Sequence, residues 1–139
     1  MVEVTTAAQL PPAVREFLAQ PRYAVIATIN SDGSPHQAVV WYLLEDDGVI
    51  LNSKVGRRWP SNALRDPRVS ITVEEGLDYA VLTGSLEEIP DPELAQRHIR
   101  TMGLRYEGPE GVASRSPVWQ TQERVSFRLI LRRAEMRKG

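Results

Sequence analysis

One ten-residue segment carries most of the groups in this sequence that could bind a charged ligand. Its residues 53–62 include a hydroxyl, three cationic side chains, an indole ring and an amide, which belong to Ser53, Lys54, Arg57, Arg58, Trp59 and Asn62. Guanidinium groups, hydroxyls and free N–H groups at a helix start are suited to a phosphate. Trp59 adds a flat ring that can cover an aromatic ligand. The segment therefore indicates a phosphate site, or alternatively a solvated basic turn whose tryptophan packs into the end of a barrel.

Other candidate residues are more isolated. Trp41 and Tyr42 are adjacent in a strand pattern, so one should belong to the core while the other could line a cleft. His36 follows an Asp-Gly turn and is either an exposed turn residue or part of a site. Asn62 could instead cap a local helix, and Trp119 could anchor a dimer contact, because tryptophan is enriched at interfaces.

Several kinds of site are not indicated by the sequence. It has no G-x-G-x-x-G, P-loop or G-x-S-x-G motif, which argues against the corresponding nucleotide and hydrolase sites. It also has no cysteine, so neither disulfides nor thiolate metal sites are expected. His36 and His98 are far apart and lack carboxylates at ligand spacing, so we expect no metal site.

Length and charge limit the function classes further. The 139 residues fit one domain, over residues 1–139. Seventeen basic and eighteen acidic residues give a net charge of −1, which argues against electrostatic binding of nucleic acid, although a small barrel with exposed Trp and Arg could bind a single strand. No apolar run approaches the ~20 residues of a membrane span, and the N-terminus does not resemble a signal peptide. We therefore expect a soluble cytoplasmic protein that contacts neither nucleic acid nor membrane.

Most of the chain has the pattern of short antiparallel strands. Strands are predicted where β-branched and apolar residues cluster between turns, at residues 23–29, 36–44, 49–53, 69–73, 79–89 and 124–131. Turns at Asp32-Gly33 and at Asp46-Asp47-Gly48 would join the first three strands into a meander. Gly84, inside the fifth strand, predicts a bulge or a close backbone approach. A closed barrel is favoured because closure removes exposed strand edges.

Three helices are predicted around these strands. The first follows Pro11-Pro12 and ends before Pro21, and a second, of about one and a half turns, would be capped by Ser61. A third begins with Asp91 as N-cap and is closed by Gly103. Residues 104–122 are predicted to form a long loop with at most one helical turn, which would be functional or packed on a partner.

An ordered set of short motifs resembles one known family. The set comprises residues 32–35 (DGSP), 40–42 (VWY), 56–58 (GRR), 62–70 (NALRDPRVS) and Gly84. Across most of the chain it resembles the pyridoxamine-phosphate-oxidase-like, FMN-binding split β-barrel family, and more narrowly the branch that uses the deazaflavin coenzyme F-420. The resemblance implies a mainly β fold, a six-stranded antiparallel Greek-key split barrel. It also implies a homodimer with two cofactor sites at its interface.

The resemblance also implies which residues contact the cofactor. The ring system would lie against the second strand, near Gln37, Val39 and Trp41. The phosphate would contact the 53–62 segment at Ser53, Lys54, Arg57, Arg58 and the backbone near Asn62. The region around Trp119 would come from the other subunit. Many family members carry a lysine where this chain has Trp59, so a phosphate ligand is lost there or is replaced by the two arginines.

The implied function is hydride transfer from reduced coenzyme F-420 to an unsaturated or carbonyl-conjugated small molecule. The donor and acceptor atoms must approach to about 3–3.5 Å, so one face of the ring must stay open. Two alternatives keep the fold: an FMN-dependent oxidase or reductase, and a non-catalytic protein that carries a cofactor or pigment. No residue stands out as the proton donor, although Tyr42 and His36 are candidates by chain position and solvent could also serve.

Overall fold

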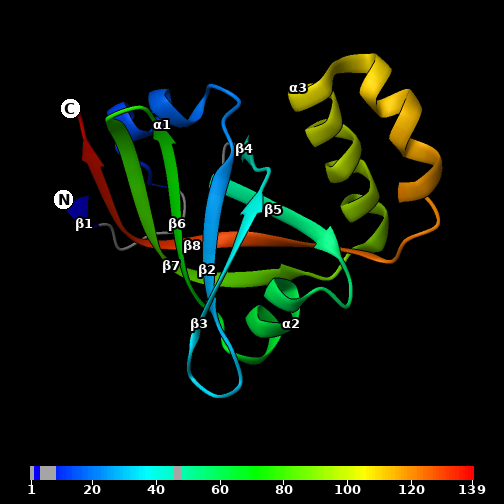
Figure 1. Cartoon of the computed structure of the whole chain (residues 1–139), viewed down its shortest axis with the longest axis horizontal. Helices are drawn as coiled ribbons and strands as arrows, with labels where there is room; N and C mark the ends of the chain where they lie inside the picture. The colour runs from blue at the N-terminus through cyan, green and yellow to red at the C-terminus, as the bar shows by residue number, and fades with distance from the viewer. Residues whose placement is uncertain (1, 4–8, 46–47) are drawn as a thin grey trace.

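A single curled antiparallel sheet forms the body of the protein (Figure 1). The computed structural model describes residues 2–3, 9–45 and 48–139, with side chains from residue 9 onward. Its eight described strands are β1 (Val2–Glu3), β2 (Ala24–Ile29), β3 (Pro35–Val40), β4 (Leu43–Glu45), β5 (Gly48–Lys54), β6 (Arg68–Glu75), β7 (Asp78–Ile89) and β8 (Arg124–Arg137). They pair in the order β3-β2-β6-β7-β8-β5-β4, and β1 pairs with β8. The predicted mainly β, antiparallel split-barrel fold is confirmed.

The described part of the chain has two more strands than the predicted six, because the second predicted strand is broken in two and because β1 was not predicted. Residues 36–44 divide at Trp41 and Tyr42, where the chain leaves its pairing with β2 and begins to pair with β5. The Tyr42 hydroxyl donates a hydrogen bond to the carbonyl of Leu18 or Gln20, at 2.8 and 2.9 Å, and the side chain is buried. Trp41 stays half-buried on the other side, as the alternation predicted. The predicted turn at residues 46–47 lies outside the described residues.

The predicted bulge at Gly84 is confirmed. The β7–β8 register shifts between Thr83 and Gly84, and a Cβ added at Gly84 would lie 2.0 Å from the carbonyl oxygen of Ile130. β8 is longer and more buried than the half-exposed strand predicted at residues 124–131, because it pairs with β7 along its length and with β5 at its start.

A methyl group at Gly84 should therefore destabilise the fold. We expect Gly84→Ala to lower the free energy of unfolding by about 2–3 kcal/mol, since a backbone carbonyl must move to admit the side chain. Urea denaturation followed by circular dichroism measures this, with Ser85→Ala as the neighbouring control on the same strand. An unchanged urea midpoint for Gly84→Ala would mean that the close approach is absent in solution.

Three helices flank the sheet, as predicted (Figure 1). They are α1 (Pro12–Leu18), α2 (Arg58–Arg65) and α3 (Pro92–Trp119). The predicted start of α2 is wrong, because the N-cap is Arg57, four residues before Ser61. The Ser61 hydroxyl donates to the Arg57 carbonyl from inside the helix, at 2.8 Å. Asp91 caps α3 as predicted, since its carboxylate accepts a hydrogen bond from the Leu94 amide at 3.0 Å.

The prediction of a loop at residues 104–122 is wrong. This region continues α3 as a second helical limb, and only Gly108 departs from helical geometry, with φ 74°. Pro109 then stands at the start of the second limb, where its missing N–H has no consequence. Gly103 does not close the helix but lies beneath Trp119, since a Cβ there would meet the indole at 2.7 Å. No helix in the described part of the chain is long and apolar enough to span a membrane.

α3 is held to the sheet by a stack of aromatic rings. Tyr106 lies parallel to Trp41, with ring centroids 5.0 Å apart, and to Tyr23 at 6.0 Å. Its hydroxyl donates to the Arg22 carbonyl at 2.7 Å and accepts from the Tyr42 amide at 3.2 Å. These contacts fix the first limb of α3 against the break between β3 and β4, so the second limb faces the same end of the sheet.

Candidate functional site

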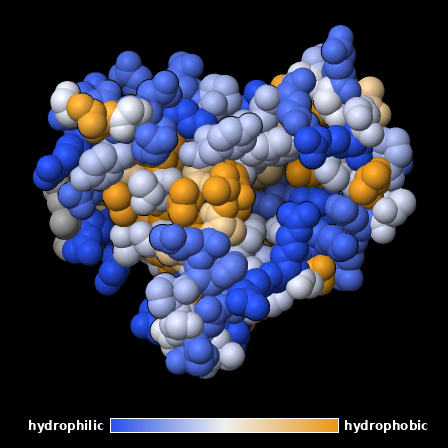
Figure 2. Space-filling model, viewed as in Figure 1, coloured by the Kyte–Doolittle hydropathy of each residue, from blue (hydrophilic) through white to orange (hydrophobic). Residues whose placement is uncertain are grey.

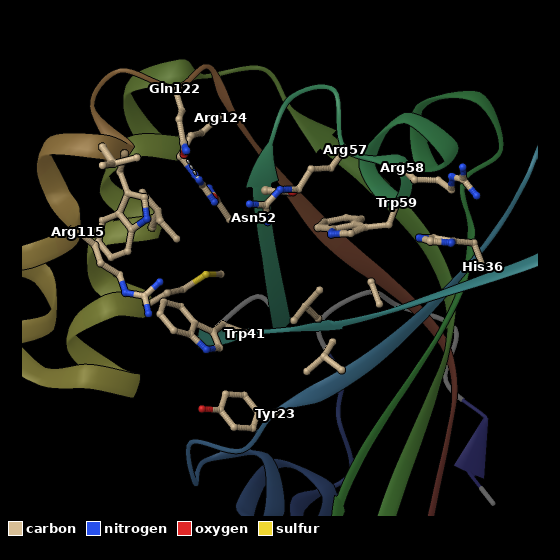
Figure 3. Close-up of a pocket in the computed structure, with 18 of the residues that line it drawn as sticks. Tyr23, His36, Trp41, Asn52, Arg57, Arg58, Trp59, Arg115, Gln122 and Arg124 are labelled. Atoms are coloured by element: carbon tan, nitrogen blue, oxygen red, sulfur yellow. Dashed lines mark hydrogen bonds between the residues drawn. The ribbon is translucent and has the colours of Figure 1, made fainter.

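A cavity of about 670 Å³ lies between the sheet and the helices (Figure 3). Its walls come from β3, β5, the start of α2, both limbs of α3 and the start of β8. On the face shown in Figure 2, hydrophilic side chains surround a hollow beside this group of elements. The cavity therefore joins the sequence segment with the cationic side chains to the helical region that was predicted to be a loop.

The side chains of the two adjacent arginines point in opposite directions. Figure 3 shows the side chain of Arg57 extending toward Asn52, while that of Arg58 extends the opposite way, toward His36. Both side chains line the cavity and are exposed. Arg57 is near enough to Arg124, at the start of β8, for its positive charge to contribute to the lowered pKa of Arg124. The cavity thus has one strongly cationic region, between α2 and β8.

Arg124 is a buried cation bound only to neutral groups. Its side chain is 8% exposed, and it donates through Nε to Asn52 Oδ1 at 2.8 Å and through Nη1 to Gln122 Oε1 at 2.5 Å. No carboxylate of residues 9–45 or 48–139 forms an ion pair with it. Burial, and secondarily the charge of Arg57, lowers the pKa of Arg124 to about 10. A buried guanidinium without a counter-charge is costly, so this group favours an anionic ligand.

Ser53 adds an unsatisfied hydroxyl to the same cavity. Its side chain is 1% exposed, and its Oγ has no hydrogen-bond partner among the described residues. Buried polar atoms normally have partners, so such an atom in a cavity wall points to a ligand that supplies one. The backbone of β5 therefore places a hydroxyl beside the cationic region.

Aromatic side chains line several sides of the cavity. Trp41, Trp59 and Trp119 all line it, and Trp41 lies within the stack that includes Tyr23. The guanidinium carbon of Arg115, from the second limb of α3, is 6.0 Å from the Trp41 ring centroid. A flat ring can lie against Trp41 while an attached anion reaches the arginines.

The cavity includes most of the residues that the sequence and the resemblance singled out. Those that line it are Val39, Trp41, Ser53, Arg57, Arg58, Trp59 and Trp119. Trp59 is also a core residue, 4% exposed, and its ring contacts Phe127 at 5.5 Å between centroids. Trp119 reaches the cavity of its own chain, whereas the resemblance assigned it to the other subunit.

Three predicted site residues lie away from the cavity. Gln37 and Lys54 are exposed and do not line it. Asn62 is buried, and its amide donates to Thr28 Oγ1 at 3.2 Å and to Asn30 Oδ1 at 3.0 Å, which connects α2 to β2. The helix cap predicted for its side chain is wrong, because the N-cap of α2 is Arg57. The phosphate contact predicted for the backbone near Asn62 stays a prediction.

Of the two candidate proton donors, only one lines the cavity. The buried Tyr42 hydroxyl is engaged with backbone carbonyls outside the cavity, and burial raises its pKa. His36 lines the cavity. The part of the chain that the structure describes contains no cluster of three or more His, Cys, Asp or Glu side chains that could hold a metal ion.

The sequence did not point to five polar residues of the cavity, namely Asn52, Ser114, Arg115, Gln122 and Arg124. Arg115 and Gln122 were hidden in the region interpreted as a loop. The β5–β8 pairing sets Lys54 opposite Arg124. Arg124 therefore reaches the site because of the register between these two strands. That pairing could have been suspected only from a correct strand order.

Comparison with known proteins identifies the family. The sequence profile described as pyridoxamine 5'-phosphate oxidase matches residues 10–129. The chain belongs to the pyridoxamine 5'-phosphate oxidase family. No curated protein sequence matches this family member.

Solved structures share the fold of this pyridoxamine 5'-phosphate oxidase family member. A conserved hypothetical protein from Mycobacterium tuberculosis is 27% identical, with TM-score 0.77, and the match covers 98% of this chain and 89% of that one. A structure described as an F-420 reductase is 22% identical, with TM-score 0.73 and coverage of 91% and 98%. A heme storage protein from Vibrio cholerae is 21% identical, with TM-score 0.69 and coverage of 91% and 94%. One fold thus serves a reductase and a heme storage protein.

The lowered pKa of Arg124 predicts how anion binding depends on pH. The guanidinium is charged below about pH 10 and loses its proton above it, so Arg124 should support anion binding up to about pH 9 and less above pH 10. Isothermal titration with inorganic pyrophosphate at several pH values measures this effect. The additional loss above pH 10 should be absent in Arg124→Met, and its persistence there would assign the titration to another group.

Proposed function

We propose that the protein is an oxidoreductase that uses coenzyme F-420 to reduce an unsaturated small molecule. The observation that carries this proposal is the buried Arg124, which faces a cavity with an aromatic wall and has no described carboxylate partner. A planar cofactor with a phosphate-bearing tail would supply a flat ring for the aromatic side chains and an anion for Arg124. The fold shared with an F-420 reductase is consistent with the proposal.

The residues of the cavity would act by binding and orientation. Arg57, Arg124 and the Ser53 hydroxyl would hold the phosphate, and Arg58 would meet a more distant anionic part of the tail. Trp41 would support the ring. When bound, the deazaflavin supplies the hydride, and the protein supplies orientation and exclusion of water. His36 lines the cavity and is the candidate proton donor, with solvent as the alternative.

We further propose that a second copy of the chain completes the site. Apolar side chains gather over β2 and β3 on the face shown in Figure 2, beside the hollow. Val39 is 69% exposed and Tyr23 is 65% exposed, and both also line the cavity; Val25, paired with Val39 across the strands, is 37% exposed. Such a patch at a sheet edge is typical of an interface. A partner seated there would close the open side of the cavity.

A second candidate function is storage or transport of heme. His36 lines the cavity and could supply an axial nitrogen, and the arginines could bind carboxylates of the porphyrin. The shared fold of the heme storage protein is consistent with this alternative. FMN is the third cofactor to test, because its phosphate would suit the same arginines.

Cofactor binding to the purified protein distinguishes these candidates. Fluorescence titration with coenzyme F-420 and with FMN, and absorbance titration with heme, give three dissociation constants. We expect coenzyme F-420 to bind tightest, in the micromolar range, and its reduced form to be oxidised when an enone or quinone is added. Tighter binding of FMN would change the cofactor, whereas tight heme binding without turnover would favour storage.

A further inference from the structure

A chain of buried polar side chains leads away from Arg124 into the protein. Asn52 is 8% exposed, Ser126 is fully buried and His98 is 5% exposed. Arg124 Nε donates to Asn52 Oδ1 at 2.8 Å, Asn52 Nδ2 donates to Ser126 Oγ at 2.9 Å, and Ser126 Oγ lies 2.7 Å from His98 Nδ1. These residues come from β5, β8 and α3, so the chain of hydrogen bonds connects the sheet to the helix behind the cavity.

The hydrogen bonds allow only one orientation of the Asn52 amide. Its Nδ2 group donates both protons, to the Ala95 carbonyl at 2.9 Å and to Ser126 Oγ. Its oxygen is thereby left to accept from Arg124. A flipped amide would place its NH₂ against the guanidinium N–H and its oxygen against the Ala95 carbonyl, and both contacts would be repulsive.

The direction of the amide is compatible with a continuous assignment of the next proton. Ser126 Oγ accepts from Asn52, and its own proton can be donated to His98 Nδ1, 2.7 Å away, in the tautomer in which Nδ1 is an acceptor. In that tautomer a neutral His98 carries its proton on Nε2, on the side where Glu45 Oε2 lies 3.9 Å away. Donation then runs in one direction, from Arg124 at the cavity through Asn52 and Ser126 to His98 on the helix.

We propose that Ser126 and His98 are positioning residues that hold the Arg124 guanidinium in place for an anionic group in the cavity. The inference rests on the proposed anion-binding role of Arg124. Asn52 transmits the restraint, since its oxygen faces Arg124 only while its NH₂ group has acceptors. Neither positioning residue lines the cavity, so each affects the ligand only through the direction and rigidity of the guanidinium.

The proposal predicts a selective loss of affinity for the charged part of the ligand. Ser126→Ala and His98→Leu should each weaken binding of coenzyme F-420 about tenfold. The same variants should bind the phosphate-free deazariboflavin chromophore as the unmodified protein does. His98→Asn should restore most of the affinity, because its Oδ1 can take the place of Nδ1 and accept from Ser126.

Two further measurements make the test independent of the proposed cofactor. Affinity for inorganic pyrophosphate, by isothermal titration, should fall about tenfold in Ser126→Ala and recover in His98→Asn relative to His98→Leu. The ¹H–¹⁵N signal of the Arg124 Nε–H should shift in Ser126→Ala without any ligand. Circular dichroism checks the fold of each variant, and Ser126→Ala, which only removes an atom, decides the matter if His98→Leu does not fold.

The outcomes separate the two proposals. If the unmodified protein binds pyrophosphate but not coenzyme F-420, the proposed function fails while the positioning role is still tested by the pyrophosphate affinities. Equal weakening of the phosphate-free chromophore and of coenzyme F-420 would mean that Ser126 and His98 serve only the fold. Unchanged affinities in Ser126→Ala, or no anion binding by the unmodified protein, would overturn the positioning role.

Discussion

Replacement of Arg57 and Arg124 together by methionine is expected to weaken coenzyme F-420 binding by about 100-fold or more. Hydrogen bonds to charged groups contribute about 1.5–3 kcal/mol each, and every 1.4 kcal/mol is about tenfold in affinity. The two guanidiniums lie on the same side of the cavity, and Arg124 is held by neutral amides that leave its charge available. Fluorescence titration of each single variant and of the double variant measures the loss.

Arg58→Met is the matched control for this prediction. Arg58 is the sequence neighbour of Arg57 and carries the same charge, but it extends toward His36 and away from Arg124 (Figure 3). We expect its replacement to weaken binding by less than about fivefold, because Arg58 is exposed and would form only a surface ion pair with the distal part of the tail. An Arg58 effect equal to that of the double variant would place the phosphate at the start of α2 and would contradict the assignment to the Arg57–Arg124 region.

The strands of this protein could be predicted because their signals are local. Turns such as Asp32-Gly33 and the β-branched runs between them set the strand positions, and the Gly84 bulge followed from one residue inside a strand pattern. The break at Trp41 and Tyr42 could not be predicted in the same way, because it reflects a change of partner strand. Local patterns do not encode the identity of the partner.

The second limb of α3 was missed for a physical reason. Gly108 and Pro109 are typical loop residues, and here the glycine provides the positive φ at the kink while the proline starts the next limb. Recognition of Arg124 required a contact between side chains 72 residues apart in sequence, with Asn52. Arg57 and Arg58 could be picked out from the sequence as candidate anion ligands. Arg124, which forms the cationic region together with Arg57, could not.

A charge on the apolar strand pair at the sheet edge should separate the proposed dimer. We expect Val25→Glu to raise the dimer dissociation constant by about 100-fold, because a carboxylate buried without a partner costs several kcal/mol. Val25 is 37% exposed and does not line the cavity, so its replacement does not touch the ligand directly. Sedimentation velocity at several micromolar protein concentrations measures the dissociation.

Leu77→Glu is the control for the dimer prediction, since Leu77 is 77% exposed but lies at the β6–β7 turn rather than on β2 or β3. It should leave the dissociation constant unchanged. If the second copy completes the cavity, Val25→Glu should also weaken coenzyme F-420 binding at concentrations where it is monomeric, and higher protein concentration should restore the affinity. A monomeric unmodified protein, or a monomeric variant that binds the cofactor at full affinity, would show that one chain is sufficient. The Arg57–Arg124 region would then act without the partner.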